Sequence, residues 1–238
     1  MAFISILKSK AFWATQLSKM NDPSEVIGGI NALRQILSTR PNTKNENYNL
    51  EDCSKEVPFA CSFSEDSDSL DQWRSYADDA KGVAIGINLK RIGWHSSYLV
   101  PIQVDVKYGK PSFEERVNNF LDDQDYIEKE NNLEAFLKYE RYAFKEDGYA
   151  SEKEARLVVP VSIYDEQTPV HYKVDDTGLR KYIELKHSDV KWSSIEEVVI
   201  GPACKLTEGD IRFILKKESI PNADSIEIKK SKHNYRSK

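Results

Sequence analysis

One segment, residues 152–161, limits the fold of this chain more than any other. Its second half, Leu-Val-Val-Pro-Val at residues 157–161, is an apolar run typical of a buried strand. Because side chains alternate along a strand, Glu152, Glu154 and Arg156 are predicted to share one face. Two carboxylates in this relation lie about 7 Å apart and repel each other unless a positive or hydroxylated group lies between them. The segment is therefore either a solvated strand face or a site for sugar hydroxyls and cationic transition states.

Hydrophobic periodicity divides the rest of the chain into strands and helices. Alternating runs predict strands at residues 12–15, 59–64, 82–88, 100–108, 170–174, 181–185, 197–200 and 225–229. Helical spacing predicts helices at residues 2–10, 22–37, 70–80 and 207–218, and a helical insertion at about 112–145. This order predicts an α+β fold with a mixed, largely antiparallel sheet and flanking helices. The strand at 82–88 is expected to share a sheet with the strand at 59–64, which is close in sequence.

Composition favours one soluble domain. The chain has 238 residues, of which 39% are hydrophobic, so it can bury a sizeable core. We expect a single α+β domain over residues 1–228, and a basic tail over residues 229–238 that forms a frayed, solvated terminus. The net charge of −5 argues against a sequence-independent nucleic-acid binder, which would present a basic face.

Cysteine and histidine usage gives no sign of a metal site or a disulfide framework. Cys53, Cys61 and Cys204 lack metal-ligand spacing, and the four histidines are scattered singly. A reduced, cytoplasmic protein fits best. No run approaches the roughly 20 apolar residues of a membrane span, and the apolar start at residues 1–7 lacks the features of a signal peptide. The oligomeric state is left open by the sequence.

The turn at residues 21–25, Asn-Asp-Pro-Ser-Glu, has the features of a helix start. Asp22 is predicted as the N-cap, Pro23 as the first helical residue, and Glu25 completes a capping box. The backbone N–H groups of such a turn can also hold a phosphate. Asn21 is therefore kept as a candidate ligand-binding residue beside the capping interpretation.

Two further groups of residues are candidates for a site. Ser62 and Ser64 lie on one face of a predicted strand, so two hydroxyls emerge beside each other. No histidine near in sequence could activate them, which disfavours a serine hydrolase. Trp73 and Tyr76 lie three residues apart on a predicted helix, a pattern that belongs to a core more often than to a base-stacking platform.

Six blocks, taken together and in order, resemble a large bacterial family catalogued as a domain of unknown function, number 2971. The blocks are Asn-Asp-Pro-x-Glu (21–25), Cys-Ser-Phe-Ser-Glu (61–65), Trp-x-x-Tyr-Ala (73–77), Gly-Val-Ala-Ile-Gly (82–86), Glu-x-Glu-x-Arg (152–156) and Ile-Gly-Pro (200–202). Each block alone is weak, whereas the ordered set is specific and extends over nearly the whole chain. The family name itself implies no chemistry.

The order of elements also has a weaker similarity to the ADP-ribosyltransferase fold, and this similarity implies NAD as cofactor. It implies that Glu154 holds the nicotinamide ribose 2′-hydroxyl and stabilises an oxocarbenium-like transition state, while Glu152 orients the acceptor. Ser62 or Ser64 would support the cofactor and Trp73 or Tyr76 would flank the nicotinamide; the candidate cofactor-binding set is Asn21, Ser62, Ser64, Trp73, Tyr76 and Arg156. The first strand of that plan, with its aromatic and polar residues, is missing here, since the chain starts at the first helix.

The resulting hypothesis is an NAD-dependent ADP-ribosyltransferase-like enzyme, as a toxin or phage-defence effector with a nucleic-acid or protein acceptor. One alternative is a non-catalytic module that binds a nucleotide or nucleic acid, which the missing first strand favours. Another is an interaction subunit of a defence assembly, with the acidic turn at residues 65–71 as its contact surface. Under the enzyme hypothesis, Ser62 or Ser64 and Glu154 should open onto a common cleft.

Overall fold

The computed structural model describes residues 2–20, 25–40, 55–92, 101–123, 130–175, 178–186 and 194–236. The chain divides into two compact units, each assembled from separate segments. Unit 1 comprises Met1–Phe12, Ser64–Val100 and Glu184–Lys238, and unit 2 comprises Trp13–Phe63 and Pro101–Ile183. That residues 1–228 form one domain stays a prediction.

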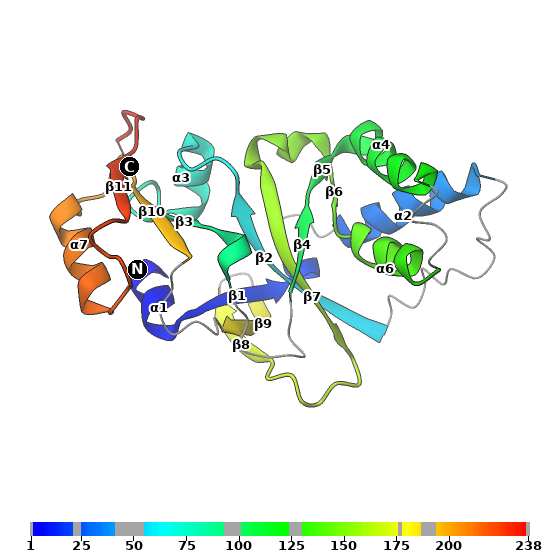
Figure 1. Ribbon diagram of the computed structural model, residues 1–238, viewed down its shortest axis with the longest axis horizontal. Coiled ribbons are helices and arrows are strands. Elements are labelled where there is room, and N and C mark those ends of the chain that lie inside the picture. Colours follow the sequence, from blue (N-terminus) through cyan, green and yellow to red (C-terminus); the bar gives the residue numbers. More distant parts are fainter. Residues whose placement is uncertain are drawn as a thin grey trace. The chain divides into compact units, whose positions relative to one another are not determined.

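Most of unit 2 is built on a six-stranded sheet with the strand order β4-β7-β2-β1-β9-β8. The strands are β1 (Ala11–Gln16), β2 (Glu56–Ser64), β4 (Ile102–Asp105), β7 (Glu154–Ser162), β8 (His171–Asp175) and β9 (Gly178–Lys186). The pairs β1–β2, β4–β7 and β8–β9 are antiparallel. The predicted α+β class with largely antiparallel sheets is confirmed, and β2 and β7 are neighbours in the six-stranded sheet (Figure 1).

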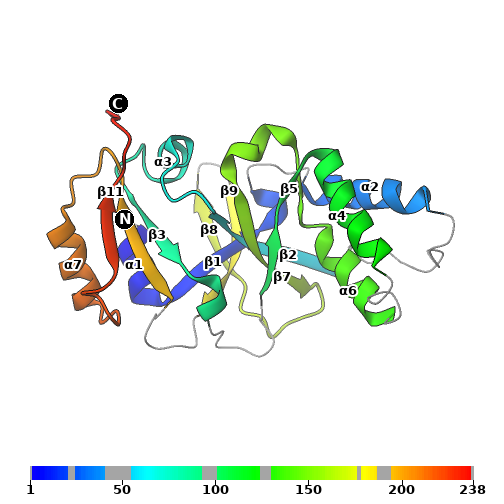
Figure 2. The ribbon, with the colours of Figure 1, turned by 45° about the horizontal axis from the view of Figure 1, so that its top comes forward.

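Helices α2 (Glu25–Ser38), α4 (Gly109–Asp122) and α6 (Glu130–Glu140) gather beside a small parallel sheet of β5 (Lys107–Tyr108) and β6 (Phe144–Lys145) (Figures 1 and 2). Small residues let α2 approach closely, because a Cβ on Gly29 would overlap the backbone carbonyl of Arg141. The core between these elements is apolar; its buried members include Leu17, Leu33, Ala60, Phe113, Val117, Leu137, Ala143 and Val158.

The region predicted as a helical insertion at about 112–145 contains α4, α6 and then β6. Residues 124–129 lie outside the described part of the chain. The predicted N-cap turn at residues 21–24 also lies outside it, so the capping role of Asp22 and the ligand role of Asn21 stay predictions. The helix that follows this turn is present, and α2 ends at Ser38, one residue beyond the expected end.

Unit 1 contains a three-stranded sheet with the order β11-β10-β3, formed by β3 (Val83–Ile87), β10 (Ile195–Ile200) and β11 (Glu227–Lys230). The expectation that β3 shares a sheet with β2 is wrong: β3 pairs antiparallel with β10, with Val83 opposite Ile200. The helices of this unit are α1 (Ala2–Ser9), α3 (Leu70–Tyr76) and α7 (Glu208–Lys217), and α7 lies beside β11 (Figure 2). Thr207 caps α7 as predicted, in a capping box with Asp210.

Two of the sequence blocks, those at residues 82–86 and 200–202, meet at the β3–β10 pair. The N–H of Gly201 donates to the carbonyl of Gly82 at 3.0 Å. A Cβ on Gly201 would lie 2.6 Å from the carbonyl oxygen of Ala80 and 2.7 Å from that of Gly82, so the backbones approach too closely for a side chain. The glycine at residue 201 therefore has a structural explanation.

Helix α3 ends earlier than predicted, at Tyr76 rather than at Ala80. Asp78, Asp79 and Ala80 all have positive φ, so the chain turns in the left-handed region instead of continuing the helix. The N–H of Ala80 donates to the carbonyl of Trp73 at 2.9 Å, which closes this turn. Trp73, Ala80 and Val199 form a small buried core.

The C-terminal tail is anchored, so the expectation of a frayed terminus is wrong for its described part. The N–H of Lys232 donates to the Asp68 carboxylate at 2.8 Å, and the His233 ring contacts the Asp68 carbonyl at 2.7 Å. The Tyr235 hydroxyl donates to Asp79 at 2.6 Å. The basic composition predicted solvation, but backbone and aromatic groups of the tail supply the contacts. The acidic turn thus binds the chain's own tail.

Candidate functional site

The chain from the last residue of α6 to the last residue of β6 carries several charged side chains into the interior of unit 2. Glu140, Arg141 and Lys145 are all 5% exposed or less. Burial of a charge is costly unless a partner compensates it. Each of the three has an opposite charge from another element. Glu140 pairs with Arg116 on α4, Arg141 pairs with Glu56 on β2, and Lys145 pairs with Glu154 of β7 and with the acid two residues before it. Residues 140–145 are thus fixed by ion pairs from three sides.

Glu154 and Arg156 form the innermost pair. They are the first and third residues of β7, so alternation places them on one face, as predicted. The Arg156 guanidinium donates from Nε to Glu154 Oε1 at 2.6 Å and from Nη2 to Oε2 at 2.8 Å. Its Nη1 donates to the carbonyl of Tyr142 at 3.1 Å. Arg156 is 0% exposed, so this pair is closed to solvent on the arginine side.

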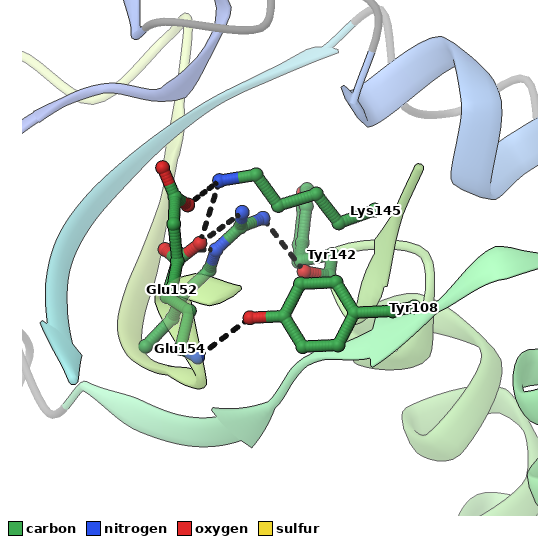
Figure 3. Close-up of polar contacts among 6 residues, drawn as sticks. Tyr108, Tyr142, Lys145, Glu152 and Glu154 are labelled. Carbon is green, nitrogen blue, oxygen red and sulfur yellow. Dashed lines mark hydrogen bonds and ion pairs between the residues drawn. The ribbon is translucent and has the colours of Figure 1, made fainter. Parts of the chain in front are cut away.

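Lys145 lies between the two acids (Figure 3). Its Nζ donates to Glu152 Oε2 at 2.5 Å and to Glu154 Oε2 at 2.9 Å. A positive group between the carboxylates is what their spacing required. Glu152 ends a short 3-10 helix, Asp147–Glu152, and Lys153 then adopts a left-handed conformation with φ 44°. The strand therefore begins at Glu154, two residues later than the alternation of charges indicated.

Two hydroxyls complete the surroundings of Glu154. The Tyr108 hydroxyl, at the end of β5, accepts the Glu154 N–H at 2.6 Å (Figure 3). Ser62 is an exposed residue of the neighbouring strand β2, and its side-chain hydrogen bond helps to lower the pKa of the Glu154 carboxyl. We call this group the Glu154 cluster; its members are Ser62, Tyr108, Tyr142, Lys145, Glu152, Glu154 and Arg156.

The cluster keeps Glu154 ionised. Burial on its own would raise the pKa of this carboxyl, but the hydrogen bond and charge of Arg156, with help from Ser62 and Lys145, lower the pKa to about 2. Burial raises the pKa of the Tyr108 hydroxyl, and the charges of Glu154 and Glu152 add to this. Glu154 can therefore act through its negative charge, and it is not suited to donate a proton at neutral pH.

Two other kinds of chemistry find no support near the cluster. Cys61 adjoins Ser62 on β2, but burial raises the pKa of its thiol to about 12, so it is not an activated nucleophile. Within the described ranges, no three His, Cys, Asp or Glu side chains are grouped so that they could hold a metal ion.

The structure brings four of the predicted site residues together and places three others elsewhere. Glu152, Glu154, Arg156 and Ser62 meet in unit 2, whereas Ser64, Trp73 and Tyr76 belong to unit 1; Asn21 lies outside the described residues. The Trp73 side chain is 3% exposed and donates its Nε1–H to Asp68 at 2.7 Å.

The other two predicted residues of unit 1, Ser64 and Tyr76, differ in their surroundings. Tyr76 is 58% exposed. The Ser64 hydroxyl accepts the N–H of Asp66 at 3.1 Å and so shapes the acidic turn.

Sequence reasoning missed Lys145, Tyr108 and Tyr142. One signal could have found the lysine: it directly follows the apolar run Tyr-Ala-Phe at residues 142–144, where a buried cation needs an acid partner. Nothing comparable identified Tyr108, because its role depends on the pairing of β5 with β6.

Comparison with protein families gives one match. The family described as "Protein of unknown function (DUF2971)" matches residues 72–157, and this confirms the resemblance predicted from the sequence blocks. The matched segment contains the blocks at 73–77, 82–86 and 152–156, and it is shorter than the nearly complete span that the blocks predicted. No match was found among curated proteins or among solved structures. None of the helices described here is long and apolar enough to cross a membrane.

Proposed function

We propose that this protein is an NAD-dependent ADP-ribosyltransferase-like enzyme and that the Glu154 cluster is its catalytic site. The observation that carries the proposal is that β2 and β7 are neighbours in one sheet, which brings Ser62 to the Glu154 carboxylate and helps to lower the pKa of that carboxyl. These residues come from different strands, and the ADP-ribosyltransferase similarity implied both of them as NAD-handling groups. An ionised carboxylate beside an exposed hydroxyl also suits a polyhydroxylated group that becomes positively charged.

Each side chain has a defined role in this proposal. NAD, when bound, supplies a ribose whose bond to nicotinamide breaks with the electron pair leaving on nicotinamide. Glu154 stabilises the positive charge that develops on the ribose, because its low pKa keeps it ionised. The acceptor nucleophile would bond to the ribose carbon that nicotinamide leaves, and Glu152 would orient this acceptor and take up the proton that it loses. Arg156 and Lys145 hold the two carboxylates, and Ser62 contacts the ribose side.

The biological setting that we propose with this activity is a toxin or phage-defence effector in the cytoplasm. The acceptor would be a nucleic acid or a protein. The reduced-cysteine composition supports the cytoplasmic location, because the three cysteines show no disulfide framework in their spacing.

A second candidate is a non-catalytic nucleotide-binding module of the same fold. It is favoured by the completeness of the pairing, since both oxygens of Glu154 accept from Arg156 and one also accepts from Lys145. In this alternative the cluster fixes the start of β7 and makes no contact with a reacting atom. NAD or a related nucleotide would then bind without being consumed.

Measurement of NAD consumption distinguishes the two candidates. The wild type should release nicotinamide from NAD, and Glu154→Gln should reduce the rate by about 100-fold or more, because the stabilising charge is lost. Glu56→Gln is the matched control, since Glu56 is also an ion-paired acid of unit 2 but lies outside the cluster.

Because Glu154→Gln could fail to fold, the test also needs a variant that keeps the Glu154–Arg156 ion pair. Glu154→Gln leaves Arg156 buried without its partner charge, whereas Ser62→Ala removes only an exposed hydroxyl. We expect Ser62→Ala to melt like the wild type and to consume NAD about tenfold more slowly. A wild type that binds NAD without releasing nicotinamide would support the binding module and refute the enzyme.

A further inference from the structure

Lys145 links the two acids of the Glu154 cluster to the small sheet formed by β5 and β6. It lies in β6, whose register partner in β5 is Tyr108. These cross-strand neighbours both reach Glu154, the lysine through the carboxylate and the tyrosine through the backbone N–H. The small β5–β6 sheet therefore holds the start of β7 at two points.

The backbone between the acids adopts a conformation that needs support. Lys153 has φ 44° and ψ 54°, a left-handed conformation that is unfavourable for a residue with a side chain. This turn places Glu152 and Glu154 so that both carboxylates reach the Lys145 ammonium. Lys145 is 4% exposed, so its attraction for the two acids is weakly screened by water.

We propose that Lys145 is a positioning residue that holds Glu152 beside Glu154. The inference rests on the proposed function, in which Glu152 orients the acceptor. Arg156 also donates to both oxygens of Glu154, so this carboxylate keeps two charge-assisted hydrogen bonds when the ammonium is lost. Glu152 instead ends a short 3-10 helix and is paired with Lys145. The ammonium contacts Glu152 at 2.5 Å, so its loss should loosen the 3-10 helix that Glu152 ends.

Backbone hydrogen exchange tests this directly. In Lys145→Met the amides of residues 147–153 should exchange about tenfold faster than in the wild type. Lys138→Met is the matched control, because Lys138 comes from the neighbouring helix α6 and pairs with Glu56. The control should leave exchange of this segment unchanged. Equal exchange in Lys145→Met and the wild type would overturn the proposal.

A double-mutant cycle keeps the test decisive if Lys145→Met is destabilised. Lys145→Met leaves two acids without their ammonium, and Glu152→Gln then removes one of them. The double variant should melt no lower than Lys145→Met alone. If instead the shifts in Tm of the single variants add, then Lys145 and Glu152 do not interact and the proposal is wrong.

Kinetics then separate positioning from a purely structural role. Lys145→Met should lower kcat for NAD consumption by about tenfold with KM for NAD within about twofold of the wild type, since the ribose contacts of Glu154 are kept. A change in KM alone would contradict positioning of Glu152. Exchange and melting do not require turnover, so if NAD is not consumed by the wild type, the proposed function fails while the positioning of Glu152 is still decided.

Discussion

At the scale of single residues, the Glu154–Arg156 pair shows how β7 tolerates charges that the rest of the strand excludes. Both side chains are almost fully buried, and each has several hydrogen-bonding partners. A buried pair of this kind contributes little against an apolar replacement of both residues, but removal of one partner costs about 3–5 kcal/mol. The pair is thus a poor source of net stability and a strong constraint on which residues can stand there.

The low pKa of Glu154 predicts acid sensitivity. Its folded-state pKa of about 2 lies below its ordinary value of 4.5, so the ionised form is stabilised by folding. This contribution, worth about 3 kcal/mol, is fully present above the ordinary carboxyl pKa and is lost as the pH falls towards 2. The urea-unfolding free energy of the wild type should therefore fall between about pH 5 and pH 3.

Glu154→Gln provides the comparison for this prediction. The glutamine cannot titrate, so the variant should be less stable at pH 7 and should lose less of its remaining stability on acidification. Parallel pH profiles for the two proteins would mean that Glu154 is not held in its ionised form by Arg156.

The same residues show what alternation along a strand can predict. Glu154 and Arg156 share a face and Ser62 reaches the same carboxylate, in agreement with a period of two applied to β7 and β2. Lys145 and Tyr108 escaped prediction because they belong to two-residue strands, which are too short to leave a periodic pattern. Their position is determined by the register between β5 and β6, and register is a tertiary property.

At the scale of elements, the existence of strands was predictable but the pairing of β3 was not. Consecutive strands are usually neighbours, which favoured β2 as its partner. The turn and α3 between them belong to unit 1, and β3 pairs with β10 there. What the sequence did contain was a pair of glycine motifs, at residues 82–86 and 200–202, whose contact explains the pairing.

That contact predicts a specific intolerance at Gly201. In Gly201→Ala the new Cβ would overlap two backbone carbonyl oxygens, of Ala80 and Gly82, which cannot move as a flexible side chain can. Overlap of this kind costs about 1–3 kcal/mol, so Tm should fall by several degrees. Gly209→Ala in the same unit is the control, since its nearest neighbour would be the Thr207 hydroxyl at 3.6 Å. Similar melting of the two variants would disprove the close backbone approach.

At the scale of the whole molecule, the C-terminal segment forms hydrogen bonds with residues from the first third of the chain. Unit 1 is assembled from three stretches, and residues 231–235 contact residues 68–79 across more than 150 positions of sequence. Composition indicated a solvated basic tail because Lys and Arg are abundant there. The contacts instead come from a backbone N–H, an imidazole and a phenol. A count of charged residues does not identify the partners of such groups.

Removal of this returning segment should weaken unit 1. Deletion of residues 231–238 removes the hydrogen bonds of Lys232, His233 and Tyr235, and with Tyr235 an aromatic ring that packs against the Trp73 core. Each lost hydrogen bond is worth about 1 kcal/mol, and Asp68 and Asp79 would lose partners. Tm should therefore fall by about 5 °C or more, whereas deletion of residues 237–238 alone leaves these contacts in place and should melt like the full chain. Equal melting of both truncated proteins would mean that the tail contributes nothing to the stability of unit 1, and the basic terminus would then be free to meet other partners.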